Sequence, residues 1–221
     1  GVGAVMGSKN LKAVVAQGSK NPTLADTAGM RKLSVTISKE VGVDVKKGSS
    51  LREYGTAYVP QLTNTLGILP TRNFQTGTFE GTDQIDGVAL KEKYLIRHTP
   101  CYRCPISCGR LTAVDDEEYA GKGEGPEYES IASLGSACGV DHLGALTKAN
   151  YWCNELGMDT ISTGMTIAAA MEMYEKGYIP EEDIGQPLRF GDADAVIEMI
   201  QKMAYRDGFG DSLAEGSYRL A

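Results

Sequence analysis

Long apolar runs and clusters of basic residues are both missing from this chain. The 221 residues include 22 Lys and Arg against 29 Asp and Glu, which gives a net charge of −7. No stretch approaches the roughly 20 apolar residues of a membrane-spanning helix, and no charged-then-apolar signal segment opens the chain. A nucleic-acid surface would need a basic face to contact phosphates. These absences predict a soluble, cytoplasmic protein that binds neither membranes nor nucleic acids.

Cysteine is also scarce, and its distribution is uneven. Three of the five cysteines lie in the stretch TPCYRCPISCGR, as Cys101, Cys104 and Cys108. Such clustering is unlike a secreted disulfide framework and in a cytosolic protein indicates metal binding or catalysis. Thiolates bind soft or borderline metals. The CxxCxxxC spacing is similar to iron–sulfur ligation, in which local cysteines hold three corners of a cluster and a fourth ligand comes from elsewhere.

Spacing alone leaves two other interpretations of the cysteine run open. Zinc could be bound by the three thiols together with His98 or His142. The three thiols could also be buried or unconnected. Cys138 and Cys153 both lie in apolar patterns, where a small buried thiol is a better interpretation than a fourth cluster ligand.

Helical periodicity dominates most of the chain. After a glycine-rich turn at the start, β-branched residues predict a short strand over residues 11–16. Helices are predicted by apolar spacing and capping signals over residues 24–45, 49–66, 88–97, 128–138, 143–153, 160–174, 192–206 and from 211 onward. The second of these would follow a break at Gly48 and be capped by Ser49 or Ser50. Residues 67–87 and 114–127 are expected to be loops. The predicted fold class is therefore mainly α, with a short β segment at the N-terminus.

Several motifs accompany the cysteine run in a fixed order. GAVMGSKNLKAVV stands at the start, GILPTRNF and GPEYES flank the run, and NELGMDTISTG and GDSLAEG follow it. With these motifs the chain resembles the tungsten-containing aldehyde ferredoxin oxidoreductase family from its first residue to its last. The resemblance implies that residues 1–20 are the tail of an N-terminal pterin-binding domain. Residues 21–221 would then form a helical domain that is truncated at its C-terminus.

The resemblance also implies two cofactors. Cys101, Cys104 and Cys108 would ligate a [4Fe-4S] cluster whose fourth cysteine lies beyond Ala221. A tungsten bis-molybdopterin cofactor would be contacted by the segment that corresponds to the family's DxxGLD motif. The pterin-binding residues implied there are Asn154, Gly157, Met158 and Asp159.

Two positions depart from that pterin motif. Asn154 stands in place of Asp, which keeps a hydrogen-bond acceptor and adds a donor but loses the charge. Met158 stands in place of Leu and conserves its volume. Without the family, the same segment is interpreted as a helix end at Gly157 followed by the N-cap of the next helix.

GPEYES supplies the candidate catalytic residues, Glu129 first and Glu127 second. Activating water or substrate requires a group that carries a proton, and a carboxyl group can do so. The simpler interpretation is that these carboxylates stabilise the dipole of a helix start. The resemblance favours Glu129 as the active-site acid/base, whereas residues 115–118 are expected to form a solvated loop.

The implied activity is the oxidation of an aldehyde to a carboxylate, with ferredoxin as electron acceptor, in an anaerobic setting. Implied partners are ferredoxin, the aldehyde substrate, and either a second copy of the chain or further electron-transfer subunits. The tungsten subunit of a class II benzoyl-CoA reductase is an alternative, which Asn154 and Met158 keep open. A third interpretation is a non-catalytic helical module stabilised by an iron–sulfur cluster or by zinc. The segment alone is expected to be inactive.

Overall fold

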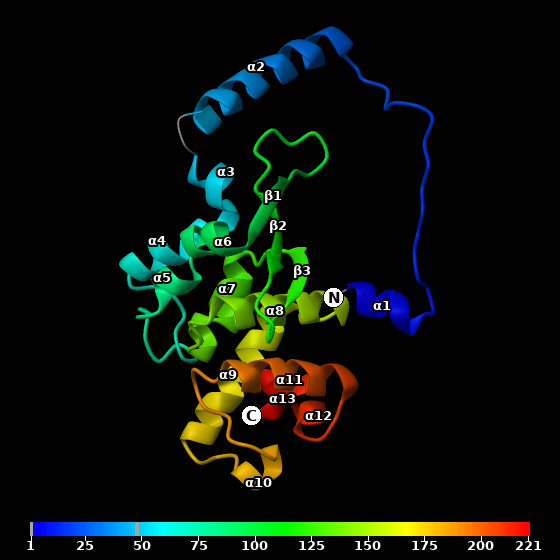
Figure 1. The fold of residues 1–221 in the computed structure, drawn as a ribbon. Helices are drawn as coiled ribbons and strands as arrows, with labels where there is room; N and C mark the ends of the chain where they lie inside the picture. The colour runs from blue at the N-terminus through cyan, green and yellow to red at the C-terminus, as the bar shows by residue number, and fades with distance from the viewer. Residues whose placement is uncertain (1, 47–48) are drawn as a thin grey trace.

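The computed structural model describes residues 2–46 and 49–221, and most of them are helical (Figure 1). The helices, including two 3₁₀ helices labelled η, are α1 Val2–Ser8, α2 Thr27–Lys46, α3 Ser50–Tyr54, η1 Gly55–Tyr58, α4 Val59–Thr65, α5 Thr82–Ile85, α6 Gly87–Tyr94, α7 Tyr128–Leu134, η2 Ser136–Cys138, α8 Leu143–Glu155, α9 Thr160–Glu175, α10 Glu181–Ile184, α11 Ala193–Tyr205, α12 Phe209–Ala214 and α13 Ser217–Leu220. The predicted mainly α fold is confirmed.

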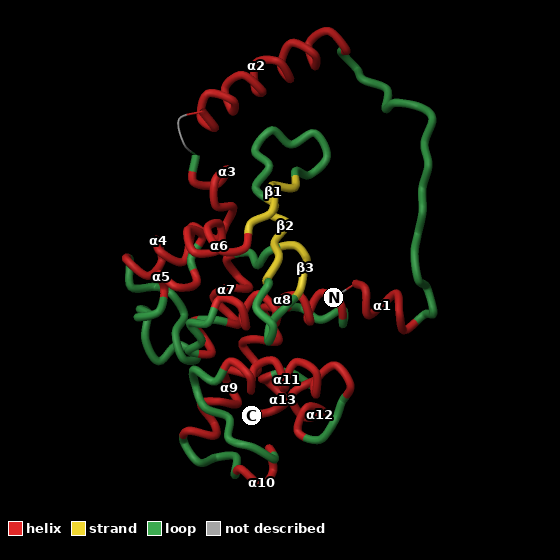
Figure 2. Tube along the Cα trace, viewed as in Figure 1, coloured by secondary structure: helices red, strands yellow, loops and turns green. Residues whose placement is uncertain are grey.

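A small antiparallel sheet lies beside the helices, in the order β1-β2-β3. Its strands are β1 Leu95–Thr99, β2 Gly109–Val114 and β3 Gly121–Glu124. Thr99 pairs with Gly109, so residues 100–108 form the loop of the first hairpin. Figure 2 shows this loop extending beyond the end of the sheet. The sheet therefore presents the whole cysteine run on one connection, which we call the cysteine hairpin.

The sheet corrects two predictions. The helix predicted over residues 88–97 ends at Tyr94, because Leu95 and Arg97 pair with Thr112 and Leu111 of β2. The loop predicted over residues 114–127 contains β3. Along β2, half-buried and buried positions alternate. Two of the buried positions are the polar residues Arg110 and Thr112, so the sequence of β2 does not look like that of a core strand.

The N-terminal segment also differs from expectation. Residues 2–8 form α1 rather than a glycine-rich turn. Residues 11–16, predicted as a strand, have no regular structure, and Val14 and Val15 are 76% and 90% exposed. A strand needs a partner for its backbone N–H and C=O groups. Within the described ranges only β1, β2 and β3 form a sheet, so this segment has no such partner.

The helix predicted up to residue 66 is divided into α3, η1 and α4. Gly55 has a φ of +60°, which interrupts the regular helix, and Ser49 precedes α3 without a side-chain cap bond. The break predicted at Gly48 lies outside the described residues. The preceding helix is confirmed as α2, but Leu33 and Ile37 on its apolar face are 54% and 47% exposed. In Figure 1, α1 and α2 lie along the outside of the molecule.

The core is formed mainly by α7, α8, α9 and α11, which confirms the helices predicted there. Its fully buried side chains include Ile131, Leu134, Leu146, Ile167, Met199 and Ile200. Gly164 lets α9 pack tightly on α7, since a Cβ there would lie 2.5 Å from the carbonyl carbon of Ser133. This contact holds the end of α7 against the second turn of α9. Among the described helices, none combines the length and apolarity needed to cross a membrane.

Candidate metal and cofactor site

The cysteine hairpin carries three free thiols. Cys101 is exposed, and Cys104 and Cys108 are half-buried. The amide of Cys104 donates a 3.0 Å hydrogen bond to the carbonyl of Cys101, and Arg103 and Ser107 both have a φ of +58°. Non-glycine residues in this left-handed region are uncommon and cluster at functional sites. The backbone therefore turns tightly twice within the run.

The chemistry of this loop fits an iron–sulfur cluster. The backbone N–H groups of Ser107 and Ile106 hydrogen-bond the sulfur of Cys104, and they lower the pKa of its thiol because they stabilise the thiolate. Thiolates with nearby N–H donors are the ligands that such clusters use. Within residues 2–46 and 49–221, however, no three Cys, His, Asp or Glu side chains are already arranged around one metal position. The fold thus brings the thiols onto one loop, and binding would have to draw them together.

The other two cysteines are core residues, as their apolar surroundings predicted. Cys138 and Cys153 are both 0% exposed, and burial raises the pKa of each thiol to about 12. The thiol of Cys138 donates to the carbonyls of Ser133 and Gly164 at 3.4 Å. A protonated thiol held inside a helical core is not a cluster ligand.

The two histidines have different surroundings. His142 is the N-cap of α8, where its Nδ1 accepts a 3.1 Å bond from the amide of Ala145. Its ring also lies 4.9 Å from that of Tyr119. His98 lies on β1 opposite Arg110. His142 therefore has a capping role at the start of α8.

Alkylation should separate the two classes of cysteine. At about pH 8 the metal-free protein is expected to be modified at Cys101, Cys104 and Cys108, because alkylation requires an accessible thiolate. Cys138 and Cys153 should react only after unfolding, since burial keeps them protonated. Mass spectrometry of the digested protein measures each site. Equal rates at Cys138 and Cys104 in the folded protein would contradict this assignment.

The two glutamates of GPEYES have different surroundings. Glu127 precedes α7, and both of its oxygens are engaged: Oε1 lies 3.3 Å from Nη2 of Arg110, and Oε2 accepts a hydrogen bond from Thr56. Glu129 lies in the first turn of α7 and is exposed. No hydrogen bond or ion pair involves the Glu129 carboxylate in the part of the chain that the structure describes. These contacts suit Glu127 to holding structure and leave Glu129 available for proton transfer.

The segment proposed to bind pterin connects α8 to α9. Gly157 has a φ of +71°, and Asp159 is the N-cap of α9, with Oδ2 accepting a 2.7 Å bond from the amide of Ser162. Hydrogen bonds from the side chain and the amide of Ser162 lower the pKa of Asp159. The cap-to-cap interpretation of this segment is therefore confirmed. A ligand role would use the remaining acceptor capacity of the carboxylate.

Three of the four predicted pterin-binding residues line one hollow. Gly157, Met158 and Asp159 form one wall, next to Leu156. The rest of the lining comes from α1, α9, α11, α12 and the turn after α12: Ala4, Ser162, Thr163, Thr166, Met203, Ala204, Leu213, Ala214 and Gly216. Asn154 lies apart from them, in a hollow beside β3 that Lys122 and Tyr151 also line. The carbonyl of Asn154 accepts a 3.3 Å bond from the amide of Gly157, but Asn154 lines a different hollow from the other three residues.

The helix that carries Glu129 is bonded to the start of the helix that follows the pterin segment. Ser130 and Thr160 share a 2.8 Å hydrogen bond between their hydroxyls, and the hydroxyl of Ser133 donates to the carbonyl of Thr160 at 3.2 Å. Ser130 follows Glu129 in the chain, and Thr160 follows Asp159. The two motifs, which lie 30 residues apart in the sequence, are therefore adjacent in the fold.

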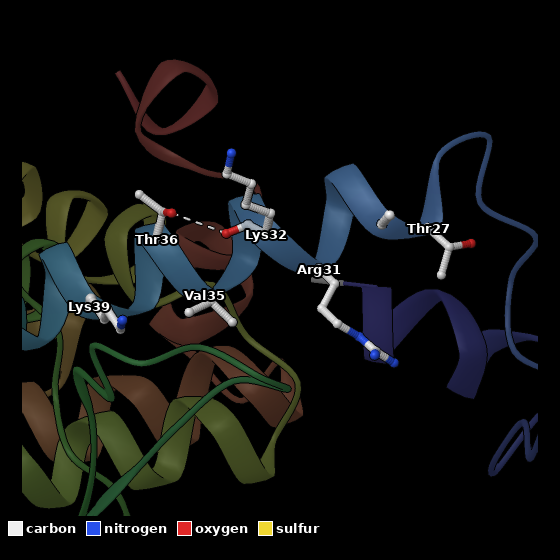
Figure 3. A pocket seen from close by; sticks show the side chains of 7 residues that line it. Thr27, Arg31, Lys32, Val35, Thr36 and Lys39 are labelled. Carbon is white, nitrogen blue, oxygen red and sulfur yellow. Dashed lines mark hydrogen bonds between the residues drawn. The ribbon is translucent and has the colours of Figure 1, made fainter.

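Another hollow runs along α2 (Figure 3). One helix provides its whole lining: Thr27, Ala28, Arg31, Lys32, Val35, Thr36 and Lys39. Figure 3 shows the Arg31 and Lys32 side chains leaving the helix in different directions, and Thr36 donating to the carbonyl of Lys32. The lining contains cations but neither a thiol nor a carboxylate. It offers none of the groups that metal ligation or proton transfer at the site would need.

Comparison with known proteins decides the family. A family model described as "Aldehyde ferredoxin oxidoreductase, domains 2 & 3" matches residues 32–221. The chain belongs to the aldehyde ferredoxin oxidoreductase family. Tungsten-containing aldehyde ferredoxin oxidoreductases of Pyrococcus furiosus and Thermococcus kodakarensis are each 47% identical to it over 226 aligned residues. Each alignment covers all of this chain and 36% of the relative, so the chain spans about a third of their length.

A more distant relative and a solved structure are also similar to this chain. An aliphatic sulfonate oxidoreductase, WOR-like subunit, of Pyrococcus furiosus is 32% identical over the whole chain and 35% of its own length. The BamBC active-site complex of a benzoyl coenzyme A reductase contains a chain that superposes with a TM-score of 0.72. That match has 24% identity and covers all of this chain and 35% of the other. It supports the fold, and the resemblance inferred from the motifs is confirmed.

Proposed function

We propose that this chain is a segment of a tungsten-pterin, iron–sulfur oxidoreductase that oxidises aldehydes to carboxylates and passes the electrons to ferredoxin. The observation that carries the proposal is the Ser130–Thr160 hydrogen bond, which joins the start of α7, where Glu129 lies, to the start of α9, next to Asp159. The relatives at 47% identity, named as tungsten-containing aldehyde ferredoxin oxidoreductases, support the substrate class and the electron acceptor. A second copy of the chain or further electron-transfer subunits would complete the assembly.

The proposed cofactor sites follow the proposed domains. Residues 1–20 would be the tail of a pterin-binding domain, and residues 21–221 a helical domain. Cys101, Cys104 and Cys108 would hold a [4Fe-4S] cluster. Because Cys138 and Cys153 are buried as protonated thiols, a fourth thiolate would come from outside residues 1–221.

The chain's own residues would position the pterin and move a proton. When bound, the tungsten-pterin group would supply the two-electron redox chemistry. Gly157 allows the backbone to approach a ligand closely, and Asp159 can accept hydrogen bonds from the N–H groups of a heterocycle. Water gives its oxygen to the aldehyde and releases protons as two electrons leave. The Glu129 carboxylate, free of other partners among the described residues, would accept one of those protons.

A role in benzoyl-CoA reduction has weaker support. The relevant structure shares the fold at 24% identity. The departures at Asn154 and Met158 are compatible with it, but the relatives at 47% identity are named for aldehydes. Aldehyde oxidation is therefore the function we put forward.

The test uses the full-length protein, purified without oxygen. Tungsten and about four irons per chain, together with viologen reduction that depends on added aldehyde, are the expected results. Viologen reduction that depends on a dienoyl-CoA and not on aldehydes would show that the substrate is a CoA thioester and not an aldehyde. Zinc in place of iron and tungsten would overturn the proposal.

A further inference from the structure

Arg110 is a buried charge next to the cysteine hairpin. Its side chain is 1% exposed, although it lies only two residues after Cys108. Nη1 donates a 2.9 Å bond to the carbonyl of Cys108, and Nη2 donates a 2.8 Å bond to the carbonyl of Pro126. Glu127, 3.3 Å from Nη2, is the only carboxylate in ion-pair distance of Arg110 among the described residues. One guanidinium therefore binds both the cysteine hairpin and the segment that leads into α7.

Gly55 and Thr56 enclose this guanidinium. A Cβ on Gly55 would collide with Nη1 of Arg110 and would lie 2.6 Å from the carbonyl oxygen of Cys108. The hydroxyl of Thr56 donates to Glu127 and accepts a 2.9 Å bond from the amide of Tyr128. The network ties the turn between α3 and η1, the cysteine hairpin and the first residue of α7 to one buried cation.

We propose that Arg110 is a positioning residue that couples the cysteine hairpin to the start of α7, and that its charge raises the reduction potential of the cluster bound there. The inference rests on the proposed function, because it needs a cluster on the hairpin. Glu129 lies in the first turn of α7, so the coupling would join the cluster ligands to the acid/base candidate. The sequence offered no signal for this role, since an arginine after a cysteine run is usually exposed.

The expected effect on the reduction potential follows from the positions of the Arg110 and Glu127 charges. Reducing a cluster adds negative charge, and a nearby cation stabilises the reduced form. The interaction weakens little when the cation is shielded from water, as Arg110 is. Glu127 opposes it, but its side chain is 47% exposed, so solvent screens its charge more strongly. Removing Arg110 and removing the charge of Glu127 should therefore shift the potential in opposite directions.

Arg52 provides a comparison for the positioning part. Its Nη1 donates a 2.8 Å bond to the carbonyl of Ile106, so it also holds the cysteine hairpin, but from α3. Among the described residues, no hydrogen bond or ion pair joins the Arg52 side chain to the start of α7. Hydrogen exchange in the full-length protein should therefore rise by about tenfold or more in both residues 100–108 and the first turn of α7 for Arg110→Met. The same rise for Arg52→Met should be confined to residues 100–108.

The potential is measured by redox titration of the cluster's electron paramagnetic resonance signal in the full-length enzyme. Arg110→Met should make the midpoint potential more negative, Arg110→Lys should restore most of the shift, and Glu127→Gln should make it more positive. Arg206→Met is the matched control, because it removes an arginine that pairs with Asp211 and Glu215. Arg206 is the C-cap residue of α11, and Figure 1 shows α11 well away from the hairpin loop between β1 and β2. This control should leave the potential unchanged.

The outcomes separate this inference from the proposed function. Unchanged potentials, or shifts of the same sign in Arg110→Met and Glu127→Gln, would overturn the electrostatic part while a cluster is still present. If Arg110→Met loses the cluster, the midpoint potential of Glu127→Gln tests the electrostatic part. A shift to a more positive potential supports the inference, and an unchanged potential overturns it. Exchange confined to the hairpin in Arg110→Met would overturn the coupling. A wild-type enzyme without iron would instead remove the proposed function, and this inference with it.

Discussion

Replacing Gly55 with alanine is expected to lower the free energy of unfolding by about 3 kcal/mol or more, which is the scale of breaking a buried charge pair. Two effects combine at this position. The backbone of Gly55, with a φ of +60° and a ψ of −156°, lies in a region that essentially only glycine adopts, so a residue with a Cβ is strained there by about 1–3 kcal/mol. The added methyl group would also displace the guanidinium of Arg110 from its bonds to Cys108 and Glu127. Urea denaturation of the metal-free protein measures the change.

Gly177→Ala is the matched control for this prediction. Gly177 has a φ of +72°, but a Cβ there would meet no atom within 4 Å. Its substitution should therefore cost only the backbone strain of the positive φ, about 1–2 kcal/mol. Equal losses in the two variants would show that strain alone acts at Gly55, and that the packing of Arg110 against it contributes nothing.

Replacing Glu129 with glutamine is expected to lower the turnover number for aldehyde oxidation by on the order of 10²- to 10⁴-fold. Glutamine keeps the size of the side chain but cannot carry the proton. The carboxylate has no structural partner among the described residues, so stability, iron and tungsten content should stay close to those of the wild type. Steady-state viologen reduction and metal analysis of the same preparation measure both quantities.

Variants of two other glutamates serve as comparisons for Glu129→Gln. Glu118→Gln alters an exposed carboxylate in the acidic loop and should leave turnover unchanged. Glu127→Gln should lower stability, because it removes the partner of buried Arg110. A turnover number for Glu129→Gln within about twofold of the wild type would rule out the acid/base role, since general acid–base catalysis contributes far more than that.

Periodicity predicted the helical core well because the core is built from apolar faces. The spacing of Ile131 and Leu134, and the break at Gly139, correspond to α7, η2 and α8 as the structure has them. Asp192 and Arg206 cap the two ends of α11, where the pattern begins and ends. Such signals are local, so one sequence suffices to find them.

The predictions for the sheet region and for an N-terminal strand failed for the same reason. Pairing between strands is non-local, and a strand forms only where a partner exists. Residues 11–16 have β-branched side chains but no partner within the described ranges, whereas β2 pairs on both edges and buries Arg110 and Thr112. Those polar residues are buried because they have partners: Thr112, for example, shares a 2.6 Å bond with the hydroxyl of Tyr151.

The sequence predicted the motifs of the candidate site, but not which of their residues lie together in the fold. The cysteine spacing identified the hairpin thiols, and the apolar surroundings of Cys138 and Cys153 identified core thiols. The placement of Asn154 and Asp159 in different hollows, and the contact between Ser130 and Thr160, depend on how α8 and α9 pack. The central place of Arg110 depends on four segments at once. Neither result could be obtained from local spacing.

The central claim is that the cysteine hairpin of this chain holds an iron–sulfur cluster. The most direct test is the iron content of the full-length protein, purified without oxygen, in the wild type and in a variant with Cys101, Cys104 and Cys108 all replaced by serine. We expect about four irons per chain in the wild type and essentially none in the variant. A variant with Cys138 and Cys153 replaced by alanine should keep its iron. Equal iron in the wild type and the hairpin variant would contradict the claim.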